Sequence, residues 1–364
     1  MTLRLVRRLE PLDDARSLAI LYVVAIAGAL ALGSALFAAF EANPLTAYAM
    51  LLGNAFFDLR GFGYTLVQAT PLILISLGTI VAWRSGFMYL GFDGAMLVGA
   101  TAATALALGA GPDMPLQAVP PIAAVPLALL AGVVVGALWS AIVALLQVRS
   151  GGNTVLIALM TNYIAILLVQ FLVSGPMRAA GDQPQTALID RAFWLPFIIE
   201  GTRAHAGILI ALVIAAIVVV LMEKSAAGYE LVASGLNPRA ARYGGIDVGR
   251  RVVQAALIAG ALAGLAGAIT ILGVHHRLLD GLSQGTGFIG IVAALLGRLT
   301  VAGSVAASFL YSGLTVGADA MQRHTGLPAA LVQVVQALIV LCLLATEILR
   351  THRLVLAGRT AERP

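Results

Sequence analysis

The chain has 364 residues, of which 60% are hydrophobic and only 11% are charged. Soluble domains carry about 25% charged residues, so this composition argues against a soluble globular protein, an all-helical soluble bundle included. The net charge of +5 is not arranged as a basic stripe with interleaved aromatic residues, so no nucleic-acid partner is expected.

Apolar stretches long enough to cross a bilayer recur along the chain. They predict an all-α polytopic membrane protein with about ten spans, at residues 18–40, 64–83, 86–108, 122–147, 153–174, 205–222, 252–274, 285–299, 301–318 and 328–349. The first stretch is longer than the apolar core of a signal peptide and is expected to persist as a helix. One transmembrane domain over 18–349 would then lie between terminal segments 1–17 and 350–364.

The placement of Lys and Arg orients these spans. With an even number of spans, 16 of the 22 basic residues fall on the side that holds both termini, which the positive-inside rule identifies as the cytoplasm. The loop 223–251 lies on that side, and the loop 175–204 lies outside. In the outer loop, Phe193, Trp194 and Phe197 predict an aromatic anchor at the membrane interface.

Two glycine-rich segments, 84–100 and 283–297, interrupt the third and eighth spans. They occur in opposite orientation in two comparable halves, a pattern typical of inverted repeats whose half-helices point at a solute. Glycines elsewhere are expected to let helices pack closely, in small-xxx-small patterns such as Gly132 with Gly136 and Gly260 with Gly264.

Few polar residues interrupt the spans, and each has two interpretations. Asp93 either caps a half-helix beginning at Gly94 or contacts solute, and Asn162 either bonds a neighbouring helix or lines a polar path. Asn153 fits an N-cap. The candidates for the solute pathway are Tyr89, Phe92, Asp93, Asn153, Thr154, Asn162, Thr286 and Phe288.

The sequence offers no catalytic grouping within the spans and no metal site. The adjacent His275 and His276 share no helical face and are expected in a solvated turn. The only lysine is Lys224, and no Gly-Lys-Ser/Thr follows a glycine-rich loop, so a P-loop ATPase is excluded for this chain.

The polar segment "GYELVASGLNPRAARYGGIDVGR", from Gly228 to Arg250, encodes a short helix with a signal at each end. Asn237 is suited to the N-cap, Pro238 to the first helical position, and Gly244 with Gly245 to the stop. A helix of less than two turns is not stable alone in water, so another protein is expected to hold it.

This segment, together with "LMTNYIAILLV", "SGPMR" and "GVHHRLLDGLSQGTGFIGIVAALLGRL", resembles permease subunits of bacterial ATP-binding-cassette importers. The resemblance is to the branch for nucleosides and simple sugars, and it extends from about Ala47 to Leu344. Two residues depart from the family's usual pattern: Tyr89 stands in place of Asn, and Thr154 in place of Glu.

The resemblance implies a multi-pass permease of the bacterial inner membrane with both termini cytoplasmic. Its partners would be a cytoplasmic ATPase, a second and non-identical permease, and an extracytoplasmic solute-binding lipoprotein. ATP and Mg would bind to the ATPase, and this chain would hold no cofactor. The residues expected to couple to the ATPase are Glu230, Gly235, Asn237, Pro238, Arg239, Ala240, Ala241, Arg242, Gly244 and Ile246.

The expected solute is a neutral polar molecule with a ring, either a nucleoside or a ribose-like sugar. An ion-coupled secondary carrier is the alternative from another class, and uptake driven by an ion gradient without an ATPase would favour it. A membrane scaffold that moves nothing is a third interpretation.

Overall fold

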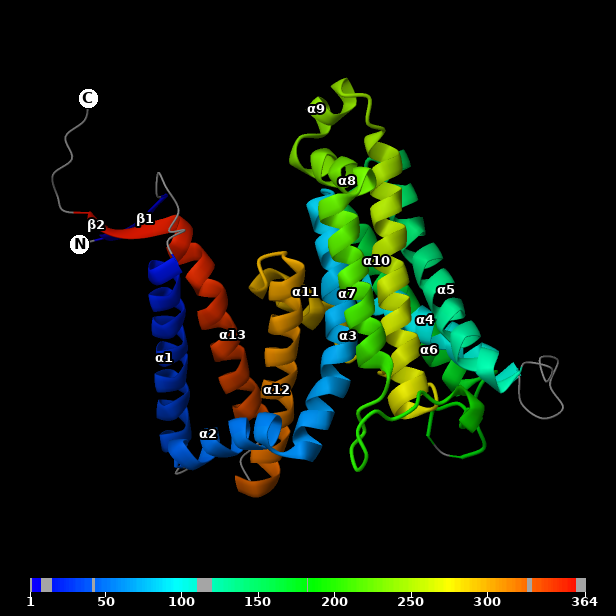
Figure 1. Ribbon diagram of the computed structural model, residues 1–364, viewed down its shortest axis with the longest axis horizontal. Coiled ribbons are helices and arrows are strands. Elements are labelled where there is room, and N and C mark those ends of the chain that lie inside the picture. Colours follow the sequence, from blue (N-terminus) through cyan, green and yellow to red (C-terminus); the bar gives the residue numbers. More distant parts are fainter. Residues whose placement is uncertain are drawn as a thin grey trace. The chain divides into compact units, whose positions relative to one another are not determined.

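The computed structural model describes residues 2–7, 15–40, 43–109, 120–181, 183–325 and 329–357 (Figure 1). The longer helices are α1 (Ala15–Ala39), α3 (Leu59–Arg84), α4 (Phe92–Gly109), α5 (Pro121–Ser150), α6 (Thr154–Ser174), α7 (Gly207–Lys224), α10 (Val248–Thr270), α12 (Val301–Thr325) and α13 (Ala329–Thr351). The shorter elements are β1 (Thr2–Arg7), α2 (Pro44–Leu52), α8 (Ala226–Leu236), α9 (Pro238–Tyr243), α11 (Thr286–Leu296), β2 (His352–Ala357), π-helical turns at Gly53–Phe57 and Ile271–His275, and a 3-10 turn at Arg191–Phe193.

The predicted polytopic helical fold is confirmed. Each of the ten predicted spans overlaps a helix. Among the described residues, seven helices are long and apolar enough to cross a membrane, and shorter apolar helices accompany them. The sequence interpretation missed α2, which begins at Pro44 behind an Asn43 cap and is too short to span a bilayer.

The chain divides into two compact units, Met1–Gly61 with Leu314–Pro364, and Phe62–Gly313. In the first unit α1 packs against α13, and β1 pairs antiparallel with β2. Leu and Val recur in both strand sequences and favour this pairing. The strand pair, which the all-α prediction did not include, brings the two ends of the chain together on one side of this unit.

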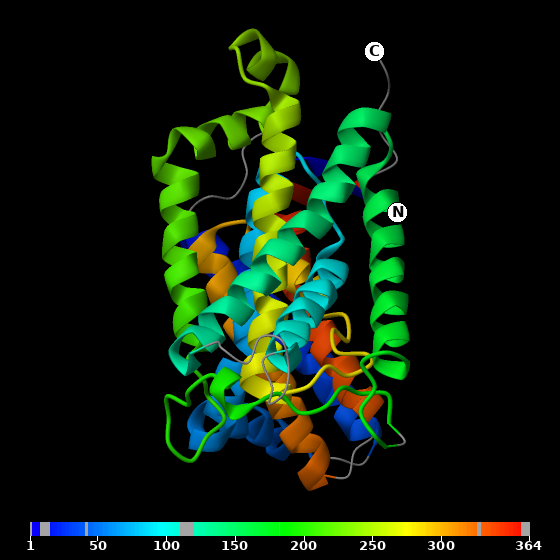
Figure 2. The same cartoon turned by 90° about the vertical axis from the view of Figure 1, so that its right-hand side faces the viewer.

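In the second unit α10 lies in the middle, against α4 and α5 (Figure 2). Glycines make this contact possible. A Cβ built on Gly264 would lie 2.1 Å from the backbone oxygen of Gly132, and one built on Gly260 would lie 2.3 Å from that of Gly136. The packing role predicted for these glycines is confirmed, because a side chain at either position would force the helix backbones apart.

The two glycine-rich interruptions are confirmed as breaks in regular helix. The chain leaves α3 at Arg84 and runs without helix to α4, which begins at Phe92, two residues before the predicted start. The second break precedes α11, which has 11 residues. Gln284 and Gly285, just before this helix, have left-handed backbone conformations. Both helices therefore begin inside the unit, where their first N–H groups need partners.

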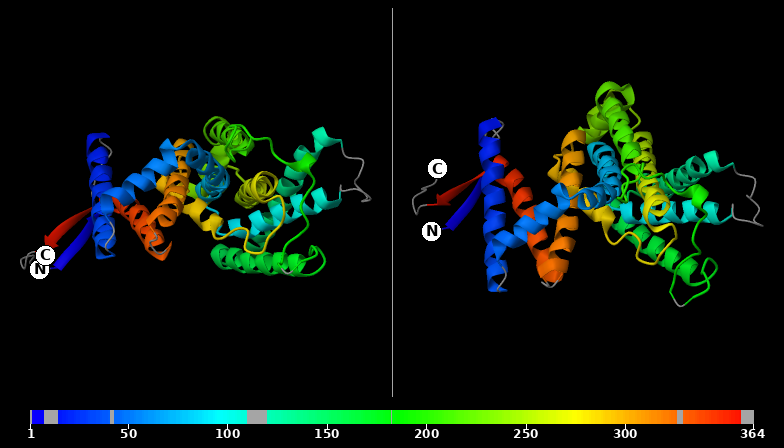
Figure 3. Two further views of the ribbon diagram at one scale, coloured as in Figure 1. Left: turned by 90° about the horizontal axis from the view of Figure 1, so that it is seen from below. Right: turned by 60° about the horizontal axis from the view of Figure 1, so that its bottom comes forward.

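The loop between α6 and α7 is fastened to the segment that follows α10 (Figure 3). The backbone N–H of Thr186 donates to Leu278 O at 3.0 Å, and that of Leu195 donates to Leu272 O at 3.0 Å. Of the residues predicted to form an interfacial anchor, Phe193 is 2% exposed and belongs to the core instead, whereas Phe197 is 55% exposed.

Two histidines are packed at this end of the unit. The ring of His276 stacks on Trp194, with ring centroids 3.8 Å apart and planes 10° from parallel, so the solvated turn predicted for both histidines holds only for His275, which is exposed. His205, in the loop just before α7, accepts a hydrogen bond from the backbone N–H of Gly207 through Nδ1 at 3.1 Å. Burial lowers the pKa of His205 to about 4. Among the described residues, no group of His, Cys, Asp and Glu is placed to hold a metal.

Candidate functional site

The chain enters the interior between α3 and α4 as an extended segment supported by aromatic rings. Gly86 begins it with a φ of +81°, a left-handed conformation that favours glycine. The Tyr89 ring stacks on Phe87 with centroids 5.4 Å apart and meets Phe92 edge to face at 4.9 Å. All three rings are fully buried. Tyr89 and Phe92, both predicted on the solute path, therefore lie behind the cavity wall, where they fill the space left by the broken helix.

Asp93, in the first turn of α4, caps the other interrupted helix. Its Oδ1 accepts a hydrogen bond from the backbone N–H of Gly287 at 2.9 Å. The hydroxyl of Ser283 and the backbone N–H of Phe288 also donate to this carboxylate. A carboxylate at the start of α11 pairs N–H groups that the first turn leaves free and is favoured there by the helix dipole. Asp93 is therefore a helix cap, as one interpretation predicted, but it caps α11 and not the helix that carries it.

Asn162, on α6, performs the corresponding role for α4. Its Oδ1 accepts from the backbone N–H of Gly94 at 2.8 Å, and its Nδ2 donates to Leu90 O at 2.9 Å. The side chain is buried, with 4% exposed. One amide thus holds both sides of the helix start, and it joins α6 to the broken segment. Of the two roles predicted for Asn162, the structure therefore shows the hydrogen bond to a neighbouring helix.

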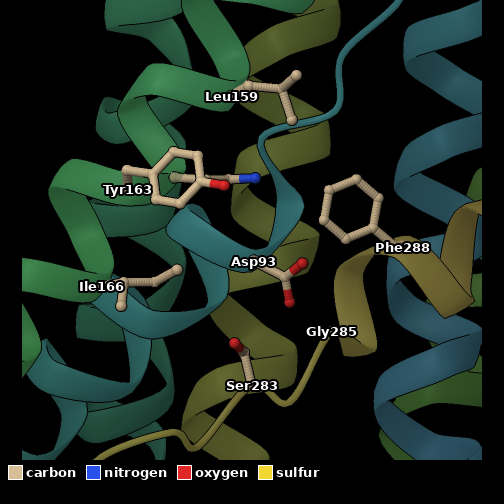
Figure 4. Close-up of a pocket in the computed structure, with 8 residues that line it drawn as sticks. Asp93, Leu159, Tyr163, Ile166, Ser283, Gly285 and Phe288 are labelled. Atoms are coloured by element: carbon tan, nitrogen blue, oxygen red, sulfur yellow. The ribbon is translucent and has the colours of Figure 1, made fainter.

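These polar groups border a cavity of about 190 Å³ (Figure 4). The residues that line it are Asp93, Leu159, Asn162, Tyr163, Ile166, Ser283, Gly285 and Phe288. The structure thus brings together three of the predicted pathway residues, Asp93, Asn162 and Phe288. Sequence reasoning did not select Tyr163 or Ser283. The helical spacing of 159, 163 and 166, which puts them on one face of α6 beside Asn162, was the available signal.

The remaining pathway candidates lie off the cavity. Asn153 is the N-cap of α6, as expected, and accepts from the backbone N–H of Val155 at 2.9 Å. Thr154 is the first residue of that helix and is buried there. Thr286, half-buried at the start of α11, donates its hydroxyl to Ser283 O. These residues shape the ends of the helices that carry the cavity.

At the opposite end of the unit from the 175–206 loop, α8 and α9 form a pair of short helices (Figure 1). Asn237 caps α9 by accepting hydrogen bonds from the backbone N–H groups of Arg239 and Ala240, both at 3.1 Å. Pro238 is the first helical residue, and Gly245 leaves the helix with a φ of +83°. The predicted short helix is therefore present, with its predicted start and stop.

The outward face of α9 is basic and aromatic. Arg239, Ala240 and Arg242 are exposed, and Tyr243 is 95% exposed. Ala241 is 5% exposed and lines the groove between α8 and α9 rather than the outward face. A groove of about 380 Å³ separates α8 from α9, and its lining includes Tyr229, Glu230, Leu236, Asn237, Gly244 and Ile246.

Two contacts tie this helix pair to the rest of the unit. Glu230 on α8 forms an ion pair with Arg251 at the start of α10. Gly235 sits against the end of α3, where an added Cβ would lie 2.1 Å from Arg84 O and 2.7 Å from the nitrogen of Gly86. Because Gly86 begins the extended segment that leads to Asp93, α8 abuts the stretch of chain that reaches the cavity.

Residues 61–344 match the family described as "Branched-chain amino acid transport system / permease component". The chain belongs to this permease family. With its apolar helices, this membership makes the protein an integral membrane protein. No solved structure matches the chain.

Three curated proteins are similar to this permease over most of their length. The guanosine ABC transporter permease protein NupP of Bacillus subtilis is 33% identical over 332 residues, 90% of this chain and 93% of the relative. A glucose ABC transporter permease protein of Haloferax volcanii is 31% identical, over 92% of this chain and 89% of the relative. The nucleoside ABC transporter permease protein NupB of Lactococcus lactis is 31% identical, over 87% and 88%.

Proposed function

We propose that the protein is the transmembrane permease subunit of an ATP-driven importer of nucleosides. The observation that carries this proposal is the cavity between the starts of α4 and α11, a mostly apolar cavity that Asp93 and Asn162 also line. Half-helices that begin inside a membrane protein are typical of solute-binding sites. The printed names of two relatives, which specify guanosine and nucleosides, support the solute class.

The energy for transport would come from a separate cytoplasmic ATPase, which would bind ATP and Mg. This chain would act without a cofactor of its own and would not be an enzyme. The exposed face of α9, with Arg239, Arg242 and Tyr243, suits docking on an acidic groove of that partner. The contact of Gly235 with the end of α3 supports a path by which movement of α8 and α9 reaches the broken segment.

A second permease and a solute-binding lipoprotein would complete the importer. Much of α6 faces outward from this chain, with Leu167 62% exposed and Phe171 66% exposed (Figure 2). This face suits a helix of the second permease, which would close the open side of the cavity. The location would be the inner membrane of a bacterium, with α8, α9 and both termini in the cytoplasm, because that side then holds most of the basic residues.

Replacement of Asn237–Tyr243 by a flexible Gly/Ser stretch tests the coupling role. We expect insertion into the membrane to be unchanged and ATP-driven uptake to be lost, because a disordered segment transmits no push. The test measures solute uptake in vesicles together with the ATPase activity of the complex. Normal uptake by this variant would show that α9 is not the coupling element.

Import of a simple sugar is the second candidate, favoured by the 31% identity to the glucose permease of Haloferax volcanii. Labelled guanosine and labelled glucose, offered separately to vesicles that contain the complete importer, distinguish the two. Uptake of glucose without guanosine would replace nucleoside import by sugar import.

A further inference from the structure

Two aromatic side chains stand on opposite walls of the cavity. Tyr163 projects from α6 and Phe288 from α11, with Asp93 between them on the floor (Figure 4). The two side chains are 62% and 45% exposed. A flat apolar ring that enters between them would cover both, and stacking on aromatic faces is favourable for any planar heterocycle.

The floor of the cavity has hydrogen-bonding capacity that the protein leaves unused. Asp93 accepts from three protein donors, and a carboxylate offers about four acceptor positions. Asn162 uses one N–H and one lone pair for the start of α4. Its second N–H and second lone pair are left over by those two bonds, because an amide can take part in about four. Asp93 and Asn162 thus offer hydrogen-bond acceptors, and Asn162 also offers a donor, to the polar edge of a ring in the cavity.

The charge of the cavity selects against anions. The only carboxylate on its wall is Asp93, and none of its lining residues is Lys, Arg or His. A phosphate group placed there would face a carboxylate with no counter-charge, which is costly in a partly dehydrated site. A neutral solute with N–H groups meets no such penalty.

The size of the cavity limits what it holds. Pockets for drug-sized ligands have volumes of about 300–1,000 Å³, whereas this cavity has about 190 Å³. It therefore accommodates one ring system and leaves the rest of a glycoside outside, on the open side of α6.

We propose that this cavity binds the uncharged heteroaromatic ring of the solute, clamped between Tyr163 and Phe288 with its N–H edge toward Asp93 and Asn162. The proposal rests on the proposed function, because the cavity must lie on the transport path. It adds the chemical class, a neutral N–H-bearing heterocycle, and it names the two rings as determinants of specificity.

The test uses the complete importer in proteoliposomes, with tritiated guanosine as the probe and guanosine monophosphate as competitor. Phe288→Leu and Tyr163→Leu remove an aromatic face, whereas Phe288→Tyr and Tyr163→Phe keep it. Phe57→Leu is the control, since Phe57 is 88% exposed, does not line the cavity and lies outside the faces assigned to partner proteins. We expect the two Leu variants at the cavity to lose about tenfold in kcat/KM, and the control and the aromatic variants to stay close to wild type. The monophosphate should not compete.

A second measurement does not depend on turnover. Irradiation of the wild-type importer with an azido-substituted guanosine should label peptides that contain 159–166 and 285–288. If the wild type imports guanosine but the Leu variants match the Phe57→Leu control, or the label lies elsewhere, the aromatic clamp is refuted while the proposed function stands. If the wild type imports glucose and not guanosine, the proposed solute class fails and this ring site fails with it.

Discussion

The amide of Asn162 makes the sharpest prediction about what holds the cavity together. Asn162→Leu keeps the size of the side chain but removes the hydrogen bonds to the Gly94 N–H at 2.8 Å and to Leu90 O at 2.9 Å. The Gly94 N–H is buried and would be left without its partner, at a cost of about 1–3 kcal/mol. Leu90 is only partly buried, so water can recover some of the second bond.

In membrane proteins the cost of losing each such bond is smaller than in water. Hydrogen bonds between membrane helices average about 0.6 kcal/mol and reach about 1.7 kcal/mol, since a chain unfolded in the membrane finds other partners. Loss of a helix N-cap costs about 0.5–2 kcal/mol in water. For the two bonds together we expect Asn162→Leu to destabilise the permease by about 1–3 kcal/mol.

The assay is thermal unfolding of the purified permease in detergent, followed by tryptophan fluorescence. Trp139 is a local reporter, because its Nε1 would lie 3.1 Å from a Cβ at Gly94. Thr161→Val is the matched control on the same helix, since the Thr161 hydroxyl bonds only Ala158 O, within its own helix at 2.8 Å. We expect the midpoint to fall by several degrees for Asn162→Leu and by little for the control. Equal midpoints for the two variants would refute the claim that Asn162 holds the start of α4.

Three further predictions concern other parts of the second unit. Gly264→Ala should destabilise the permease by about 1–3 kcal/mol through overpacking, because the new Cβ would lie 2.1 Å from a backbone oxygen of α5. Gly28→Ala on α1 is the control, since its new Cβ would have no atom within 4 Å, and the thermal midpoints of the two variants are compared. Glu230→Arg and Arg251→Glu should each reduce ATP-driven uptake several-fold, and the variant that carries both exchanges should restore uptake, since the ion pair joins α8 to α10. If the double variant does not recover uptake, the ion pair is not needed for coupling. Burial lowers the pKa of His205 to about 4, below its ordinary 6.5, so the unfolded chain binds the proton more readily. Stability from this site is present above about pH 6.5 and is lost as the pH falls toward 4; His205→Gln should flatten the thermal midpoint over that interval, and an unchanged slope would argue against burial of a neutral His205.

The sequence was sufficient for the features that depend on the bilayer and on local backbone chemistry. Apolar runs located a helix at each of the ten predicted positions, and seven helices among the described residues are long and apolar enough to cross a bilayer. The start and stop of α9 were also predicted, since Asn237, Pro238 and Gly244 act on their immediate neighbours. The glycine breaks before α4 and α11 were visible for the same reason.

Contacts between distant parts of the chain were decided by the tertiary structure. The sequence left Asp93 either as a cap of its own helix or as a contact to solute, but the carboxylate reaches Gly287, 194 residues further along. It placed Tyr89 on the solute path, but the ring is completely buried beside Phe87. A cap or a cavity wall depends on which helix lies opposite, and no local pattern encodes that neighbour. The sequence by itself therefore determined that the chain is a polytopic helical membrane protein and where two of its helices break, whereas only the packing of α4, α6 and α11 determined which side chains meet at the breaks.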